Sequence, residues 1–219
     1  MPDCYLFAGP SLAPAAAAQA SQSQIVVLPP AKRGDVGRLA AERKPATLVV
    51  ADGRFHDAMS VGHAELRDAI RRGWRVWGVS SLGAIRAYEM RHLGMRGYGN
   101  VYRLFYKFAD FQDDEVALLH APHPPYTAAS EPLVHIRYAL GYLVRYALVQ
   151  PAQATRILRT LKGLWYGFRT LALFAELAAA GAPSAKRQGV AHAIADFDRF
   201  RVKQKDLAAL LATRPWRQP

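Results

Sequence analysis

The sequence has only one cysteine, Cys4, among its 219 residues, so no disulfide can form within the chain. A chain without disulfides suits a reducing compartment, and we therefore expect a cytoplasmic protein. The sequence also lacks an apolar run long enough to span a bilayer. The apolar segment of residues 138–149 contains Arg145 and is followed by Pro151, so we expect a core helix there. A secretory signal is absent as well, because residues 1–20 have no basic start and prolines interrupt their apolar stretch. We expect no membrane partner.

Acidic residues are scarce: 17 Asp and Glu stand against 29 Lys and Arg, which gives a formal net charge of +12. The excess is uneven, because residues 151–219 hold 12 basic and 4 acidic residues. Such a surface suits an acidic partner, whether nucleic acid, an acidic carrier protein or an acidic domain, and a basic face exposed only to solvent is the alternative. Basic and aromatic residues alternate in residues 162–169 (KGLWYGFR), but helical spacing favours core positions for Trp165 and Phe168. A nucleic-acid partner is therefore not expected.

With 51% hydrophobic and 21% charged residues, the chain has the composition of a globular protein with a sizeable core. Four short apolar runs end in turns, at residues 4–8, 25–28, 47–51 and 75–79. Segments of helical periodicity alternate with them, at residues 13–20, 35–43, 56–72 and 81–92. This alternation predicts an α/β fold with a parallel sheet of about four strands and flanking helices. The later sequence is mainly helical, so we predict an α/β core over residues 1–140 and a helical extension over residues 141–219, packed on the core.

Polar residues follow each of the four predicted strands. Ser11 follows the first, the basic pair Lys32-Arg33 and Asp35 follow the second, Asp52 follows the third, and the pair Ser80-Ser81 follows the fourth. Because the carboxyl ends of parallel strands meet along one edge of a sheet, we expect these residues to converge there. Each has a structural alternative: Ser11 and Asp35 could be helix N-caps, and Asp52 precedes a glycine in a turn sequence. Together they predict a polar site at this edge.

The stretch of residues 74–89 (WRVWGVSSLGAIRAYE) changes from a strand pattern to a helical pattern at Ser80-Ser81. A strand that turns sharply into a helix places a hydroxyl beside the free N–H groups of the helix start, where an anion or a developing oxyanion is stabilised. α/β hydrolases hold their nucleophilic serine in this way, although residues 78–83 (GVSSLG) only approximate their motif. The alternative is that Ser80 or Ser81 is simply the N-cap of the helix.

An acidic cluster, Asp113-Asp114-Glu115, precedes the apolar residues 116–119. Neighbouring carboxylates in one short segment point apart, and acids before an apolar run are typical of a helix start. His120 and His123 lie in a proline-rich loop, and two histidines are too few for a metal centre. We therefore predict no metal and no cofactor.

Several segments of the chain resemble, in the same order, motifs of the TfuA family. They are FAGPSL (7–12), LPPAKRGD (28–35), VADGRF (50–55), HAEL (63–66), GVSSLGAIRAYE (78–89), GMRGYG (94–99) and DDEVALLH (113–120). Weaker similarity follows in PLVHIR (132–137) and VKQKD (202–206). Each motif is unspecific alone, but seven in sequence make the chain similar to this family over roughly its first 140 residues and near its end.

The resemblance implies an accessory protein for a YcaO-type enzyme, which uses ATP to exchange a backbone carbonyl oxygen of a ribosomally synthesised peptide for sulfur. It implies that the chain helps YcaO to engage the precursor peptide. It also implies sulfide release from a thiocarboxylated, ThiS-like carrier through a hydrolase-like Ser–Lys pair. Hydrolysis of a thioacid is an acyl transfer, which needs a nucleophile, a base and N–H donors for the oxyanion.

Carried onto this sequence, the resemblance makes Ser81 the first candidate nucleophile and Ser11 the second. Lys205 is the candidate base, with Lys203 beside it, and a lysine serves as a base only if its surroundings lower its pKa. Ala64 stands where many family members have a lysine, so the chain could bind without hydrolysing. The other motif residues are expected to orient the site or to brace the fold. Bracing is expected of Arg86 and Glu89, through an ion pair. The full set is Ser80, Asp52, His63, Glu65, Arg86, Glu89, Asp114 and Glu115.

Two functions therefore stay open. The first is a thioacid hydrolase that delivers sulfur to a YcaO enzyme. The second is a non-catalytic adaptor whose basic C-terminal helices, with Lys162, Lys186 and Arg187, hold the carrier or YcaO. A nucleotide or phosphate binder at the sheet edge ranks last, because the chain has no glycine-rich phosphate loop of recognised spacing.

Overall fold

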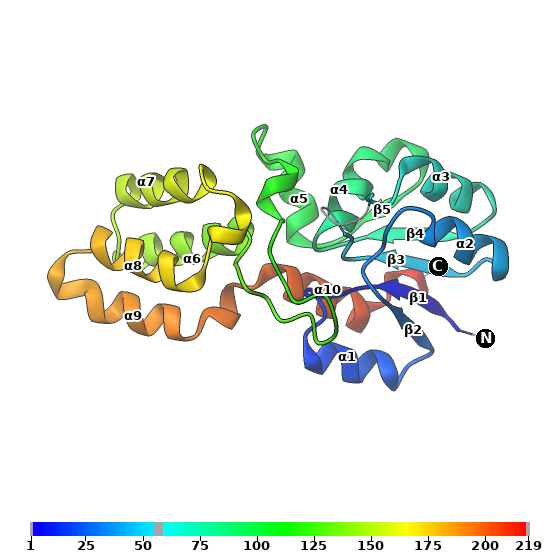
Figure 1. Cartoon of the computed structure of the whole chain (residues 1–219), viewed down its shortest axis with the longest axis horizontal. Helices are drawn as coiled ribbons and strands as arrows, with labels where there is room; N and C mark the ends of the chain where they lie inside the picture. The colour runs from blue at the N-terminus through cyan, green and yellow to red at the C-terminus, as the bar shows by residue number, and fades with distance from the viewer. Residues whose placement is uncertain (1, 55–58, 218–219) are drawn as a thin grey trace. The chain divides into compact units, whose positions relative to one another are not determined.

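The computed structural model describes residues 2–54 and 59–217 and consists of two compact units (Figure 1). Unit 1 comprises residues 1–111 and 203–219, and unit 2 comprises residues 112–202. The sequence prediction divided the chain at residue 140 and assigned its whole C-terminal part to a helical extension. The structure instead places residues 203–219 in the unit that contains the sheet, so this last segment belongs with the strands.

Unit 1 is built on a five-stranded parallel sheet, which confirms the predicted α/β class. Four strands come from the predicted apolar runs: β1 (Cys4–Phe7), β2 (Ile25–Leu28), β3 (Thr47–Val50) and β4 (Arg75–Gly78). The fifth, β5 (Arg96–Gly97), has two residues and is too short to leave a pattern in the sequence. The order is β2-β1-β3-β4-β5, so the direction of winding reverses between β1 and β3, where α/β folds commonly bind ligands.

Six helices of unit 1 flank this sheet: α1 (Pro14–Ser21), α2 (Asp35–Glu42), α3 (His63–Arg71), α4 (Leu82–Glu89), α5 (Gly99–Lys107) and α10 (Val202–Thr213). Buried leucines of α10 and buried alanines of α1 share one core cluster with the strands, so both helices cover the same face. In Figure 1, α2, α3 and α4 lie on the opposite side of the sheet from α1. Right-handed crossovers between parallel strands require this division.

Helix α3 starts at His63, later than the predicted start at residue 56. Gly62 occupies its N-cap position, and the Glu65 carboxylate accepts a hydrogen bond from the Gly62 N–H at 2.8 Å. This contact fixes the first turn. Residues 56–58 of the predicted helix lie outside the described residues, as does Phe55 of the VADGRF segment.

Two glycines allow α4 to lie very close to β3 and β4. A Cβ atom on Gly83 would come within 1.7 Å of the Val50 carbonyl oxygen, and a Cβ on Gly78 within 1.9 Å of the Gly83 carbonyl oxygen. Only glycine fits at both positions without displacing backbone. The glycines that frame the GVSSLG segment are therefore packing residues that hold the start of α4 against the ends of the central strands.

Unit 2 is helical, and the helical character predicted after residue 140 is confirmed in it. Its four α-helices are α6 (Leu133–Arg145), α7 (Pro151–Lys162), α8 (Leu171–Gly181) and α9 (Arg187–Ala195), which pack around one core cluster. The prediction that Trp165 and Phe168 belong to the core is wrong, because their side chains are 48% and 63% exposed. Helix α7 ends at Lys162, so the helical spacing assumed for them does not exist. In the described residues, no helix has both the length and the apolar character required to cross a membrane.

Candidate functional site

Ser11, Asp52 and the Ser80-Ser81 turn lie together along an edge of unit 1 that we call the strand rim. Asp35 is the first residue of α2, whose N-cap is Gly34, so the N-cap interpretation of Asp35 is wrong. Asp52 follows β3 and is buried. Its Oδ2 accepts N–H groups of Gly9 at 2.8 Å and Ser11 at 2.9 Å, and its Oδ1 accepts the Ser11 hydroxyl at 2.7 Å. The N-cap of α1 is Ala13, so the N-cap interpretation of Ser11 is wrong. Asp52 and Ser11 instead fix the loop after β1, and the fully buried Ser11 hydroxyl is committed to the carboxylate.

Ser80 lies at the turn from β4 into α4 in an uncommon conformation. Its φ angle is +67°, in the left-handed region that residues with a side chain rarely adopt. Such strain persists where the surroundings enforce it, as in the strained serine of a nucleophile elbow. The Ser80 hydroxyl is fully buried and donates to the main-chain oxygen of Lys203 at 2.7 Å. This bond joins residues that are 123 positions apart in the chain.

Ser81 occupies the N-cap position of α4 and is 4% exposed, yet its side chain makes no capping hydrogen bond. Helix capping therefore does not explain the Ser81 hydroxyl. The N–H groups of Ser81 and Gly83 both reach the Ala51 oxygen at 3.2 Å, which ties the start of α4 to the end of β3. The N–H of Leu82, the first residue of α4, has no acceptor within the helix by virtue of its position. A donor for a developing oxyanion thus stands next to Ser81.

The first turn of α10 contacts three loops of the strand rim. Lys203 is 2% exposed and receives the Ser80 hydroxyl on its main-chain oxygen. The Gln204 side chain donates to the Pro10 oxygen at 3.1 Å, in the loop after β1. Lys205, the candidate base from the sequence, is exposed. The VKQKD segment is therefore part of the strand rim, and it presents Lys203 to the interior and Lys205 to solvent.

Asp206, also in this turn, caps helix α5. Its Oδ2 accepts the Val101 N–H at 2.8 Å and its Oδ1 accepts the Asn100 side-chain amide at 3.0 Å. Burial raises the pKa of Asp206 above its ordinary value, and the hydrogen bonds from Asn100 and Val101 offset this only in part. Sequence reasoning did not single out Asp206 or Gln204.

Glu65 holds two helix starts together. Its carboxylate accepts the N–H groups of Gly34, Val36 and Gly37 at 3.1–3.2 Å, all at the start of α2, besides that of Gly62. A carboxylate at a helix N-terminus satisfies free donors and favours the helix dipole. Glu65 braces the fold.

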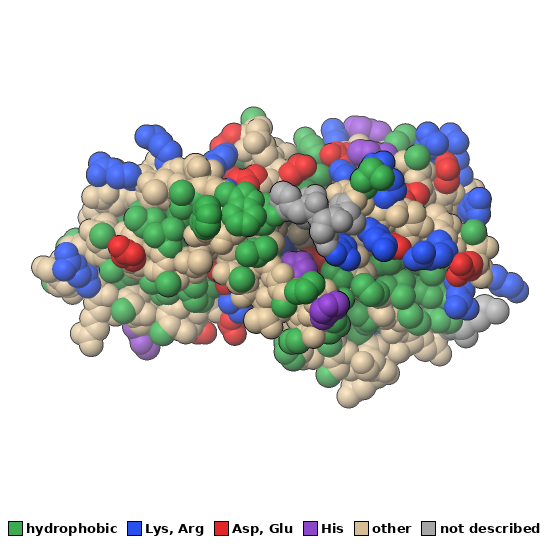
Figure 2. Space-filling view, in the orientation of Figure 1, with side chains coloured by type: hydrophobic (Ala, Val, Ile, Leu, Met, Phe, Trp, Pro, Cys, Tyr) green, Lys and Arg blue, Asp and Glu red, His purple; other side chains and the backbone are tan. Residues whose placement is uncertain are grey.

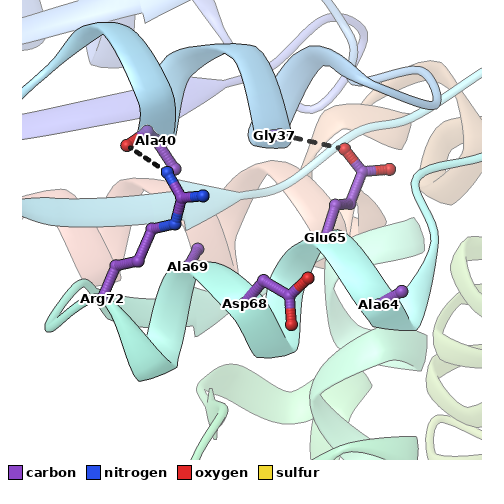
Figure 3. A pocket seen from close by; sticks show the side chains of 7 residues that line it. All are labelled: Gly37, Ala40, Ala64, Glu65, Asp68, Ala69 and Arg72. Atoms are coloured by element: carbon purple, nitrogen blue, oxygen red, sulfur yellow. Dashed lines mark hydrogen bonds between the residues drawn. The ribbon is translucent and has the colours of Figure 1, made fainter.

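Ala64, which replaces a lysine frequent in the family, lies in the helix layer. It lines a pocket of about 300 Å³ between α2 and α3 (Figure 3). The other lining residues are Gly37, Ala40, Glu65, Asp68, Ala69 and Arg72. None of these is a serine. A lysine at position 64 would add a cation to this pocket, not to the turn that holds Ser80 and Ser81.

The predicted ion pair between Arg86 and Glu89 is present, with 2.6 Å between Nη1 and Oε2. His63 Nε2 lies 2.8 Å from the same Glu89 oxygen, and Arg86 Nε donates to the Val61 oxygen at 3.0 Å. These residues join the end of α4 to the start of α3. They brace the fold on its surface.

In unit 2, the acidic segment that follows residue 112 pairs with arginines. The Asp114 carboxylate accepts Arg169 Nη2 at 2.6 Å, and Arg169 also donates to four main-chain oxygens. The fully buried Glu115 accepts two N–H groups of Arg137, at 2.8 Å and 2.6 Å, and lies 3.5 Å from Lys162 Nζ. These acids hold the segment against the helices. Within residues 2–54 and 59–217, no group of three or more His, Cys, Asp or Glu could hold a metal ion.

The family model of the TfuA-like proteins matches residues 52–170, slightly more than half of the chain. The chain belongs to this family. Membership implies a role as a partner of YcaO enzymes in thioamidation. The match includes Asp52 and the Ser80-Ser81 turn, whereas the loop after β1 and the first turn of α10 lie outside it. No curated protein matches the chain.

Proposed function

We propose that this TfuA-like protein supplies sulfide to a YcaO enzyme by hydrolysing the thiocarboxylated C-terminus of a ThiS-like carrier, and that it aids engagement of the precursor peptide. Ser81 is the nucleophile, and Lys203 is the base. Lys205 is the less suitable of the two lysines because it is exposed. A lysine accepts a proton only as a neutral amine, and burial favours the neutral form.

One observation carries the proposal: α10 returns to the sheet and is bonded through the Lys203 main chain to the Ser80 hydroxyl at 2.7 Å. This contact brings a buried lysine to the turn that holds a buried serine at the start of a helix. A nucleophile, a base and an N–H donor are the three groups that acyl transfer requires. All three belong to unit 1.

The reaction balances with these groups and water. The Ser81 oxygen attacks the thioacid carbonyl carbon while Lys203 Nζ accepts the hydroxyl proton. The oxyanion collapses, the C–S bond breaks, and sulfide leaves with a proton returned by Lys203. An ester between the carrier and Ser81 remains. Water, deprotonated by Lys203, then attacks this ester. The bond between the carbonyl carbon and the Ser81 oxygen breaks, Lys203 returns the proton to the Ser81 oxygen, and the carrier leaves with an ordinary carboxylate.

The other two serines of the rim have different roles in this proposal. The hydroxyl of Ser11 is engaged by Asp52, and the hydroxyl of Ser80 is engaged by the Lys203 main chain. Ser80 therefore positions α10 against the turn. Ser11 keeps the neighbouring loop in place.

The test is sulfide release from a thiocarboxylated ThiS-like protein by wild type, Ser81→Ala and Ser80→Ala. Ser21→Ala serves as control, because Ser21 is an exposed serine on α1. Loss of a nucleophile removes covalent catalysis, so we expect Ser81→Ala to lower the rate by at least about 100-fold while Ser21→Ala leaves it unchanged. Mass spectrometry of acid-quenched wild type should detect the carrier ester on Ser81. Unchanged release by Ser81→Ala, or an ester on Ser80, would remove Ser81 as the nucleophile.

The distribution of charge favours a second candidate, a non-catalytic adaptor. Unit 1 has 19 Lys and Arg against 10 Asp and Glu, whereas unit 2 has 10 against 7. Lys162 of unit 2 already faces Glu115. An adaptor surface for an acidic partner would therefore lie on unit 1. Salt-sensitive binding of the carrier by wild type without any sulfide release would establish this alternative.

A further inference from the structure

The segment that follows β2 crosses over the end of β1. In the sheet, β1 lies between β2 and β3, yet Ala31 forms a parallel bridge with Gly53, in the loop after β3. The Ala31 N–H also donates to the Asp52 oxygen, in the same loop, at 2.9 Å. These contacts bring the next two residues, Lys32 and Arg33, away from the open edge of the sheet and to the strand rim.

Further main-chain contacts hold this crossing segment, residues 31–33. Lys32 forms an antiparallel bridge with Ser60, and the Arg33 N–H donates to the Met59 oxygen at 2.8 Å. Because these contacts use main-chain groups, the two basic side chains are not required to keep the segment in place. Their substitution should therefore leave the fold intact.

The crossing segment lies near Ser81, with the loop after β3 between them. On one side, this loop contacts the segment through Asp52 and Gly53. On the other side, its Ala51 oxygen accepts the Ser81 N–H at 3.2 Å. A Cβ atom on Gly53 would come within 2.0 Å of the Leu82 side chain, so the loop packs directly on the residue that follows Ser81. Neighbouring extended chains lie about 4.8 Å apart, which puts the main chains of the segment and of Ser81 about 10 Å apart.

Lys32 and Arg33, which we call the basic pair, are exposed. In the described part of the chain, neither side chain forms an ion pair with a carboxylate. Asp35, the acid nearest to them in the sequence, instead accepts the Lys32 main-chain N–H at 3.0 Å and pairs with Arg38 at 2.7 Å. The strand rim therefore has two unneutralised cations whose main chain is within about one Debye length of the candidate nucleophile.

We propose that the basic pair binds the anionic C-terminus of the sulfur carrier and holds it at Ser81. The inference rests on the proposed function, in which that C-terminus is a thiocarboxylate. The negative charge of a thiocarboxylate lies on the group that the serine oxygen attacks, and it opposes the addition of a further negatively charged oxygen. Cations beside this group hold it at the strand rim and stabilise the charge that develops on the sulfur as the C–S bond breaks.

This role has to be distinguished from a general attraction between the two proteins. Figure 2 shows Lys and Arg side chains at several places on the visible face of unit 1, and such a surface attracts an acidic carrier as a whole. The basic pair, in contrast, acts on the single charge at the C-terminus of the carrier. Removal of that one charge from the carrier separates the two effects.

The probes are a ThiS-like carrier with an ordinary C-terminal carboxylate and the same carrier with a C-terminal amide, prepared by ligation. Fluorescence anisotropy measures their binding to wild type and to Lys32→Gln/Arg33→Gln at about 0.15 M salt, where distant charges are screened. We expect the double variant to weaken binding of the carboxylate carrier by about tenfold and of the amide carrier by less than about twofold. Wild type should bind the amide carrier about tenfold more weakly than the carboxylate carrier.

The matched control is Arg43→Gln/Lys44→Gln, an exposed pair that follows α2 and precedes β3, at the amino ends of the strands. This control should change the binding of either carrier by less than about twofold, since salt screens charges that lie far from the bound anion. Circular dichroism verifies that both double variants fold. The comparison of the two carriers on wild type tests the proposal without any substitution in the chain.

Equal losses for the carboxylate and amide carriers in Lys32→Gln/Arg33→Gln would reduce the basic pair to general attraction and overturn the proposal. Equal binding of the two carriers to wild type, or no measurable binding of either, would also overturn it. Because the carboxylate carrier is not hydrolysed, these results do not depend on sulfide release. If Ser81→Ala kept full release while the expected discrimination between carriers was found, the proposed function would fail and the basic pair would remain the binding site of the C-terminus.

Discussion

Three carboxylates of unit 1 have a different kind of partner from three carboxylates of unit 2. In unit 1, Asp52, Glu65 and Asp206 accept mostly N–H groups of loops and helix starts. In unit 2, Asp114, Glu115 and Glu131 pair with arginines. Carboxylates that bind main-chain donors organise the backbone around a site. Carboxylates that bind arginines join helices and neutralise charge.

The units also differ in net charge. Unit 1 has the larger excess of positive charge, 19 basic against 10 acidic residues, whereas unit 2 has 10 against 7. A positively charged unit that contains the strand rim is suited to attract an anionic protein tail.

The largest effect is expected in unit 2, from Glu115→Ala. The substitution leaves the Arg137 guanidinium and the Lys162 ammonium without the carboxylate that faces them. Removal of one partner of a buried ion pair costs about 3–5 kcal/mol of unfolding free energy. Urea unfolding measures this loss, and Glu176→Ala is the control because Glu176 is exposed on α8. A loss below about 1 kcal/mol would show that arginine pairing does not hold unit 2 together.

A smaller effect is expected in unit 1, from Asp52→Asn. The Asp52 carboxylate accepts three hydrogen bonds. In asparagine an NH2 group, which cannot accept a hydrogen bond, replaces one of the two oxygens. Hydrogen bonds to a charged group are worth about 1.5–3 kcal/mol, so we expect a loss of about 2–3 kcal/mol. Asp68→Asn, on the exposed part of α3, should change stability by less than about 0.5 kcal/mol. A loss in Asp52→Asn as large as in Glu115→Ala would erase the contrast between the units.

Two buried carboxylates, Glu131 of unit 2 and Asp206 of unit 1, should respond to acid in opposite directions. Burial alone would raise the pKa of Glu131, but the hydrogen bonds and charges of His135 and Arg201 outweigh it and hold the pKa below 4.5. Glu131 therefore contributes stability above pH 4.5 that is lost as the pH falls through its lowered pKa. The raised pKa of Asp206 has the opposite sign, so its contribution falls as the pH rises from 3.8 through that pKa.

Urea unfolding of wild type, Glu131→Gln and Asp206→Asn, measured at a series of pH values that spans 3.8 and 4.5, tests the contrast. The stability of wild type relative to Glu131→Gln should rise with pH, and that relative to Asp206→Asn should fall. Parallel slopes for the two differences would contradict the assignment of opposite shifts.

The smallest effect is expected at the surface of unit 1, from His63→Ala. His63 and Glu89 are both well exposed, with side-chain exposures of 53% and 36%, and solvent screens their contact. Exposed pairs contribute about 0.2–1 kcal/mol, and Arg86 remains to face Glu89. Thermal unfolding should detect a change of this size, and a loss above about 2 kcal/mol would mean that the start of α3 depends on this pair.

The sequence predicted the strands of unit 1 well, because β1 to β4 are short, mainly apolar runs that end in turns. It also predicted that Asp52 and the Ser80-Ser81 turn would meet at one edge, since parallel strands leave no other arrangement. It left Ser11 as either a helix cap or the second candidate nucleophile, because serine before a helix is often a cap. The Asp52–Ser11 bond joins residues 41 positions apart, and no local pattern announces it.

The sequence could not show whether Lys203 or Lys205 faces the interior and suits the role of the base. Lys203 and Lys205 are two positions apart, and on a helix such residues face different directions. Which of them faces the protein depends on where α10 packs, and the return of residues 203–219 to the sheet is a long-range contact. Trp165 and Phe168 were misplaced for a related reason, since their burial was inferred from a helix that ends at Lys162.

The proposed mechanism makes Lys203 the base and gives Lys205 no role in the chemistry. Single-turnover sulfide release from a thiocarboxylated ThiS-like protein should be compared for wild type, Lys203→Ala and Lys205→Ala, with circular dichroism to verify folding. Loss of a general base costs about 100- to 10,000-fold, so Lys203→Ala should lose release by this factor while Lys205→Ala stays within about twofold of wild type. Full release by a folded Lys203→Ala variant, or loss in Lys205→Ala alone, would contradict the account.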